Sequence, residues 1–110
     1  MHILKKNKII AKDAKLITSM IGHATGLRFS RQKNLIFELK QERKEVMDMF
    51  FVFYPIDLIF LNKNKEVIEL KRNFRPFAIY SPKKKTKYIL ELKKGTIKDK
   101  KIRLKDNISF

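Results

Sequence analysis

The chain has 110 residues, and its 27 lysines and arginines against 11 aspartates and glutamates give a formal net charge of +16. That length is typical of a single domain, residues 1–110, which can bury a core without covalent staples. The absence of cysteine excludes disulfides, thiolate nucleophiles and cysteine-based metal sites, while the charge favours a nucleic acid, an anionic membrane surface or another polyanion as partner.

The chain begins with two short apolar pieces, His2–Leu4 and Ile9–Ala11, around a polar stretch, and this pattern predicts a small hairpin. From Asp13 onward the period changes, because apolar residues then recur at helical spacing. The members of this stripe are Leu16, Ile17, Met20 and Ile21. With Asp13 as a cap and Gly22 as a stop, the sequence predicts a helix that lies against one face or open end of a sheet.

The most apolar run of the chain is MDMFFVFYPIDLIFL, residues 47–61. It is rich in phenylalanine, valine and isoleucine, which favour strands, and Pro55 divides it because proline cannot donate to a central ladder. The sequence therefore predicts two largely buried strands, Val46–Phe53 and Ile56–Leu61. The run is too short for a membrane span, which needs about 20 apolar residues.

Further short strands are predicted on both sides of this run, with turn residues between them. They cover Leu35–Leu39, Val67–Lys71, Phe77–Tyr80, Tyr88–Leu92 and Ile108–Phe110, and one helical turn is expected within Thr96–Lys105. About eight short strands and one helix define a mainly β (α+β) class. Their close spacing favours a small β-barrel or a jelly-roll-like sandwich.

Asp57 stands out because it lies between Ile56 and Leu58 inside the second strand of the apolar run. Its carboxylate must therefore be hydrogen-bonded, paired or placed at the rim of the core. A structural role is one interpretation, as a cap of the bend at Pro55 or as the partner of an arginine. The other interpretation is a carboxylate that faces a ligand at the mouth of a barrel.

A hydrolase would use a pair of carboxylates, so Asp57 would need a second acid, Asp48 or Glu91, within about 5 to 10 Å. Strand alternation instead predicts that Glu91 faces water while the residues at 88, 90 and 92 face the core. The two histidines, His2 and His23, do not have metal-ligand spacing, and the sequence has neither a Gly-x-Ser-x-Gly elbow nor a glycine-rich phosphate loop. We therefore expect no catalytic nucleophile, no metal site and no cofactor.

Several of these segments, in this order, resemble the family known as domain of unknown function 192 (DUF192). The matching features are Gly26-Leu27 with an arginine after it, Met49 seven residues before the Ile56–Leu61 block, and Tyr88–Leu92 followed by Gly95. The resemblance runs from about Ile9 to the C-terminus. It implies a compact β-barrel or jelly-roll-like domain with one helix, and no established activity, cofactor or partner.

The chain departs from the family pattern at polar positions. Family members usually have Trp-Met and then polar residues where this chain has Met49, Phe50, Phe51 and Val52, and a methionine where it has Arg28. The Gly-Asp of the family near the C-terminus is Lys105-Asp106 here. The matched polar positions that remain, and that we take as candidate ligand-binding residues, are Asp57, Arg31 and Glu91.

The basic residues admit a second kind of site. Lysine outnumbers arginine 21 to 6, whereas specific readout of phosphates and bases favours the guanidinium fork. With 14 isoleucines and no tryptophan, the lysine content also fits a genome-wide or thermophile bias. The candidate nucleic-acid-binding residues are Lys83, Lys84, Lys85, Lys87, Lys93, Lys94, Lys100, Lys101 and Arg103.

Three functions follow from these observations. The first is a small, non-enzymatic binding module for an unknown ligand or protein partner. The second is a sequence-nonspecific nucleic-acid or polyanion binder that uses its lysine-rich surface. The third is a hydrolase with Asp57 as its key acid. The N-terminal sequence lacks the apolar region and cleavage site of a secretory signal, so we expect a cytoplasmic protein without a transmembrane segment.

Overall fold

A computed structural model describes residues 1–18, 27–28 and 30–110 of the chain. Within these residues there are ten strands and one short helix. They are β1 (Ile3–Lys5), β2 (Lys8–Ala11), β3 (Lys15–Ile17), β4 (Leu35–Arg43), β5 (Met47–Asp48), β6 (Ile56–Leu61), β7 (Val67–Phe74), β8 (Ile79–Tyr80), β9 (Thr86–Lys93), α2 (Thr96–Asp99) and β10 (Ile108–Ser109). The predicted mainly β class is confirmed.

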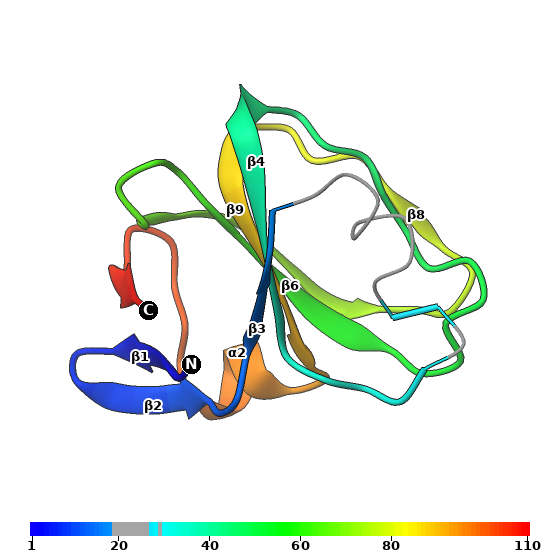
Figure 1. Cartoon of the computed structure of the whole chain (residues 1–110), viewed down its shortest axis with the longest axis horizontal. Helices are drawn as coiled ribbons and strands as arrows, with labels where there is room; N and C mark the ends of the chain where they lie inside the picture. Colours follow the sequence, from blue (N-terminus) through cyan, green and yellow to red (C-terminus); the bar gives the residue numbers. More distant parts are fainter. Residues whose placement is uncertain (19–26, 29) are drawn as a thin grey trace.

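The strands form three sheets. A central five-stranded sheet has the order β3-β4-β9-β6-β7, a three-stranded sheet has the order β10-β1-β2, and β5 pairs with β8. The central sheet is antiparallel except where β3 runs parallel to β4. Figure 1 shows β1, β2 and α2 on one side of the central strands and β8 on the other. In the part of the chain that the structure describes, the sheets lie in layers and form no closed barrel, so the sandwich alternative fits better.

Both faces of the central sheet are covered, and each has its own hydrophobic core. On the α2 face, Ile36, Ile59, Leu61, Leu90 and Leu92 pack against the three-stranded sheet and the helix. On the β5–β8 face, Leu35, Phe37, Leu58, Phe60 and Ile89 pack with Met49 and Val52. Because side chains alternate along a strand, all six residues of β6 are buried, three toward each face.

The N-terminal hairpin predicted from the sequence is confirmed by the pairing of β1 with β2. Its turn residues, Lys6 and Asn7, have φ values of 50° and 63°. Positive φ at both central positions is the type I′ geometry, whose twist matches that of the paired strands. The single helical turn expected within Thr96–Lys105 is also confirmed, since α2 lies inside that segment.

The predicted helix from Asp13 to Gly22 is wrong over Lys15–Ile17, which form strand β3, and its remainder from residue 19 lies outside the described residues. Leu16 and Ile17 pair in parallel with Ile36 and Phe37 of β4. The two neighbouring apolar residues fitted a helical stripe, but pairing with a buried strand decides the local conformation.

The predicted strand Val46–Phe53 is also wrong beyond its first residues. Only Met47–Asp48 pair as β5, and the chain then turns, with Phe51 at φ 59°. Phe53 remains 64% exposed, although the apolar composition had suggested burial. Within the described residues, no helix is long and apolar enough to cross a membrane.

Candidate functional site

Asp57 lies in β6 and its buried carboxylate faces α2. One oxygen, Oδ1, accepts a hydrogen bond from the backbone N–H of Asn73 at 3.0 Å. The other, Oδ2, accepts from the N–H groups of Gly95 at 3.1 Å and Ile97 at 2.9 Å. Asn73 and Gly95 have φ values of 49° and 91°, so the carboxylate holds two turns in left-handed conformations.

This set of partners differs from both structural roles expected for Asp57. The carboxylate neither caps the bend at Pro55 nor accepts from an arginine in the described structure; it joins a bulge of β7 to the start of α2. Three backbone donors occupy most of the roughly four lone-pair positions of a carboxylate. We infer that Asp57 holds the fold, and that little of its hydrogen-bonding capacity remains for a ligand.

Glu91 lies in β9, and the expectation that it faces water is wrong. Its side chain is 6% exposed, because it sits opposite Leu35 of β4 and Leu58 of β6 on the β5–β8 face. Burial, with a further contribution from the charge of Asp48, raises the pKa of the Glu91 carboxyl to about 8, while Arg28 acts in the opposite direction. Among the described residues, none donates a hydrogen bond to this carboxylate.

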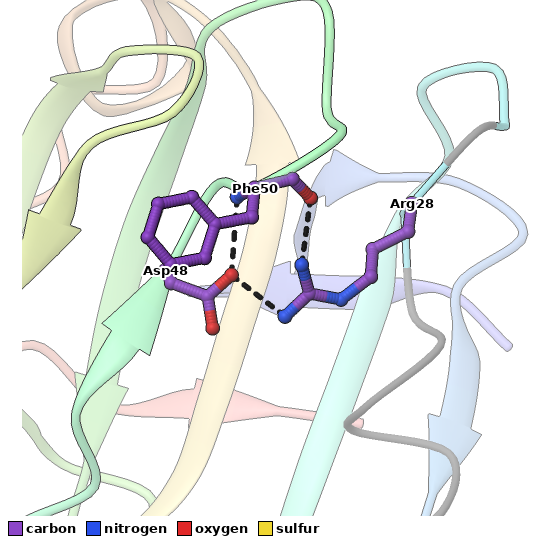
Figure 2. Close-up of polar contacts among 3 residues, drawn as sticks. All are labelled: Arg28, Asp48 and Phe50. Atoms are coloured by element: carbon purple, nitrogen blue, oxygen red, sulfur yellow. Dashed lines mark hydrogen bonds and ion pairs between the residues drawn. The ribbon is translucent and has the colours of Figure 1, made fainter.

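Arg28 and Asp48 form an ion pair on the same face (Figure 2). The guanidinium donates from Nη2 to Oδ1 of Asp48 at 2.7 Å and from Nη1 to the carbonyl oxygen of Phe50 at 2.7 Å. The same Oδ1 accepts from the backbone N–H of Phe50 at 3.1 Å. The arginine therefore fixes the turn that follows β5, and its charge partly offsets the effect of Asp48 on Glu91.

Tyr54 belongs to the same region. Burial raises the pKa of its phenol, Ser30 acts in the opposite direction, and the charge of Glu91 adds to the rise. On the β5–β8 face, the charge of Asp48 thus raises the pKa of Glu91, and the charge of Glu91 raises the pKa of Tyr54. This grouping differs from the predicted set of candidate ligand-binding residues, Asp57, Arg31 and Glu91.

The predicted trio does not converge. Asp57 is paired with Leu92 in the β6–β9 ladder, one position from the pair formed by Leu58 and Glu91. Adjacent positions point to opposite faces, so the two buried carboxylates lie on opposite sides of the sheet. Arg31 is exposed in the connection before β4. A hydrolase built on Asp57 and Glu91 is therefore incompatible with this sheet.

Some of the basic residues predicted to bind nucleic acid do lie together. Lys83, Lys84 and Arg103 line one hollow of about 520 Å³ together with Arg72. The other lining residues of this hollow, which we call the basic groove, are Ile68, Glu69, Leu70, Tyr80, Ile102 and Leu104. It runs along β7, the last strand of the central sheet. Basic and apolar side chains thus meet in one concave surface.

Glu69 organises one wall of the basic groove. Its carboxylate accepts from the backbone N–H groups of Lys83, at 3.0 Å, and Lys84, at 3.1 Å, and from the hydroxyl of Tyr80. Burial, followed by this hydrogen bond and the carboxylate charge, raises the pKa of Tyr80 to about 12. The loop that carries Lys83 and Lys84 is therefore held against β7, and both ammonium groups start from fixed backbone positions.

Two further hollows extend the basic groove. The first has a volume of about 290 Å³ and shares Arg72, Ile102 and Arg103 with the groove, adding Lys98 and Lys101. The second, of about 360 Å³, shares Lys101 with the first. Its other lining residues are Lys5, Lys6, Lys8, Ile9, Ile10, Asp99 and Lys100. Shared residues thus connect the three hollows into one basic track.

The remaining predicted basic residues lie apart from these hollows. Lys87 donates to the carbonyl oxygens of Leu39 and Lys40, which ties it to β4. Lys85, Lys93 and Lys94 are exposed and line none of the three hollows.

Sequence reasoning missed five basic residues of the track, Lys5, Lys6, Lys8, Arg72 and Lys98. It also did not assign Arg28, which lies beside Asp48. Only Arg28 gave a signal, because it replaces an apolar residue of the family pattern. Among the described residues, no group of three acidic, histidine or cysteine side chains could hold a metal ion.

The fold and site thus define a small layered β protein with a basic track on one surface and, beneath another, a buried carboxylate to which no described residue donates a hydrogen bond. The sequence matches the model of the DUF192 family, described as "Uncharacterized ACR", over residues 3–110. The chain belongs to this family, as its segments had suggested.

Curated relatives come from Thermococcales archaea and are named UPF0127 proteins. One from Pyrococcus furiosus is 32% identical over 96% of this chain and 92% of its own length. One from Thermococcus sibiricus is 35% identical over 84% of this chain, and the match spans 62% of that relative.

A solved structure shares the fold. The crystal structure of a protein of unknown function from Novosphingobium aromaticivorans superposes with a TM-score of 0.87 at 18% identity. The match covers 99% of this chain and 82% of that one. This likeness establishes the architecture of the chain.

Proposed function

We propose that the protein is a non-enzymatic binding module that holds a nucleic-acid strand, without sequence specificity, along the basic track. The observation that carries the proposal is that the three hollows are lined by basic side chains and are joined through shared residues, Arg72, Lys101 and Arg103. A continuous concave basic surface that follows a backbone is the usual arrangement in proteins that bind single strands.

The chemistry of the basic groove supports the same proposal. Arginine and lysine side chains contact phosphate oxygens, and two of the six arginines of the chain, Arg72 and Arg103, line this groove. Tyr80, Ile68 and Leu70 add apolar surface against which a base or sugar can pack. Glu69 is the one acidic residue lining the groove, and its carboxylate already accepts from the loop and from Tyr80.

The alternative of a small-ligand module built on Asp57 has less support, because backbone donors already surround that carboxylate. A cytoplasmic role as a nucleic-acid binder would use the net charge of +16 to speed encounter with its partner.

The test is fluorescence anisotropy of labelled single-stranded RNA and duplex DNA at roughly 50 and 200 mM salt, with heparin as competitor. The variant Arg72→Gln/Lys84→Gln/Arg103→Gln removes three charges from the basic groove. We expect it to weaken single-strand binding and to lower the magnitude of the salt dependence of log K by about 2, since each lost phosphate contact contributes about 0.7.

The matched control is Lys15→Gln/Lys33→Gln/Lys40→Gln, which removes the same charge from exposed residues that line none of the three hollows. We expect it to have a smaller effect on both affinity and salt dependence. Equal effects of the two triple variants, or binding that does not distinguish RNA from heparin, would mean that the charge reflects composition and that the track is no site.

A further inference from the structure

A second surface of the molecule differs from the basic track because it is strongly apolar. Ten large hydrophobic side chains are exposed in the described part of the chain, and six of them fall within residues 46–53 and 77–79. These six, which we call the phenylalanine patch, are Val46, Phe50, Phe51, Phe53, Phe77 and Ile79. A concentration of exposed apolar groups of this kind marks an interaction surface rather than ordinary scatter.

The two segments are held together as one surface. Phe77 donates its backbone N–H to the carbonyl oxygen of Met49 at 2.8 Å, and Met49 donates to the carbonyl oxygen of Ala78 at 2.9 Å. The ring of Phe77 contacts the rings of Phe51 and Phe53, with centroids 6.0 and 5.6 Å apart. The rings of Phe51, Phe53 and Phe77 therefore form one surface across segments almost thirty residues apart in sequence.

The backbone is constrained so that these rings point outward. Phe51 and Phe77 have φ values of 59° and 63°, a conformation that is unfavourable for a bulky residue without a compensating role. Met49 and Val52, which alternate with the exposed rings, are buried in the core of the β5–β8 face. Arg28 and Asp48 fix the turn between them through Phe50. Exposure of the rings is thus built into the fold.

Geometry and charge select among the possible occupants of the patch. The rings of Phe51 and Phe53 each meet the ring of Phe77 edge to face, at 71° and 68°, so neither of these two pairs forms a parallel slot for a nucleobase. No patch residue lines any of these three hollows, so the phenylalanine patch is separate from the basic track. A second copy of a chain with a net charge of +16 would be repelled.

An anionic lipid surface fits both the exposed apolar rings and the positive charge of the chain. A bilayer accepts protruding apolar rings without a shaped groove, and its negative headgroups attract the basic chain. The exposed side chains of Lys44 and Arg75 flank the two segments in sequence, where they could meet headgroups. We propose that the phenylalanine patch inserts into the interfacial region of an anionic bilayer while basic side chains around it contact the headgroups.

The experiment is flotation of the full chain with vesicles of phosphatidylcholine alone or mixed with phosphatidylglycerol. We expect binding to the mixed vesicles only, weakening as salt is added, and a loss of about tenfold or more in the Phe53→Ser/Phe77→Ser variant. The control Ile9→Ser/Leu104→Ser removes two exposed apolar side chains outside the patch and should bind as the unmodified chain does.

A reporter makes insertion visible directly. The chain has no tryptophan, so Phe53→Trp introduces a single one at an exposed patch position. Its emission should shift to shorter wavelength, and become quenched by brominated lipid, when mixed vesicles are added. Circular dichroism would verify that the variants are folded.

The outcomes separate this proposal from its rivals. Equal binding of the patch and control variants, or no binding to mixed vesicles, overturns it. A dimer that Phe53→Ser/Phe77→Ser converts to a monomer, without vesicle binding, assigns the patch to a second copy instead. The proposal does not depend on the nucleic-acid function. When Arg72→Gln/Lys84→Gln/Arg103→Gln is combined with the Phe53→Trp reporter, the tryptophan emission should still shift to shorter wavelength on addition of mixed vesicles.

Discussion

Two carboxylates, Asp57 and Glu91, are buried in neighbouring strands of one sheet and have opposite environments. Asp57 is 1% exposed and accepts three backbone hydrogen bonds on the α2 face. Glu91 is 6% exposed on the β5–β8 face and accepts none from the described residues. The contrast shows that burial alone does not tell whether an acid supports the fold, since the donors around it decide.

The physical basis of the contrast is the set of hydrogen-bond donors around each buried acid. Backbone donors aimed at a carboxylate replace the hydrogen bonds to water that burial removes. Without donors, an apolar site favours the neutral form, as the pKa of about 8 for Glu91 indicates. Asp57 therefore contributes to stability through its three backbone hydrogen bonds, whereas ionisation of Glu91 opposes folding.

Removal of Asp57 is the strongest test of this contrast. In Asp57→Ala, the N–H groups of Asn73, Gly95 and Ile97 lose their acceptor in a buried region, so we expect a loss of about 3–5 kcal/mol in the free energy of unfolding. Urea denaturation measures this loss. Asp99→Ala, at an exposed residue of α2, should change stability by less than about 0.5 kcal/mol. Equal effects of the two variants would contradict a structural role for Asp57.

Glu91→Gln tests the other carboxylate through the pH dependence of stability. The folded-state pKa of about 8 lies above the ordinary value of 4.5, so between these values the folded state holds a proton that the unfolded state has released. Stability then falls as pH rises through that window, by at most about 1.4 kcal/mol per pH unit.

Glutamine has nearly the same shape as glutamate and cannot ionise. The stability of the variant should therefore not fall as pH rises through this window. We expect Glu91→Gln to gain about 2–3 kcal/mol relative to the unmodified chain between about pH 6 and pH 8. Denaturation midpoints at a series of pH values measure the gain. Parallel pH profiles for the two proteins would show that Glu91 is ionised in the fold and would remove the contrast with Asp57.

The sequence anticipated much of the sheet and little of how charges meet across it. Ile56–Leu61 was predicted with its observed bounds, because a β-rich run between Pro55 and a polar turn has one plausible conformation. The β3 segment was mistaken for a helix, because its parallel partner β4 lies about twenty residues away and leaves no local signal.

The site residues were harder to predict for the same reason. Asp57 was identified as unusual, but its donors at Asn73, Gly95 and Ile97 depend on how β7 and α2 meet β6. Glu91 was expected in water because alternation tells which residues share a face and not whether a face is covered. The basic track joins residues from Lys5 to Arg103, a grouping that only the tertiary fold creates.

The smallest expected effects concern the charges that act on Glu91 from outside the sheet. Because Asp48 raises and Arg28 lowers the pKa of Glu91, Asp48→Asn should lower that pKa and Arg28→Met should raise it. Carbon-13 NMR of the glutamate side-chain carboxyl carbons follows the titration. Each variant breaks a partly exposed ion pair, so the stability change should be about 1 kcal/mol or less.

A charge change elsewhere provides the control for this pair of shifts. Glu45→Gln breaks another partly exposed ion pair, with Arg43, and neither residue is among the groups that act on Glu91. This variant should leave the pKa of Glu91 unchanged. If Asp48→Asn and Arg28→Met moved the pKa in the same direction, the shift would come from altered burial rather than charge. The contrast with Asp57 would then rest on desolvation alone.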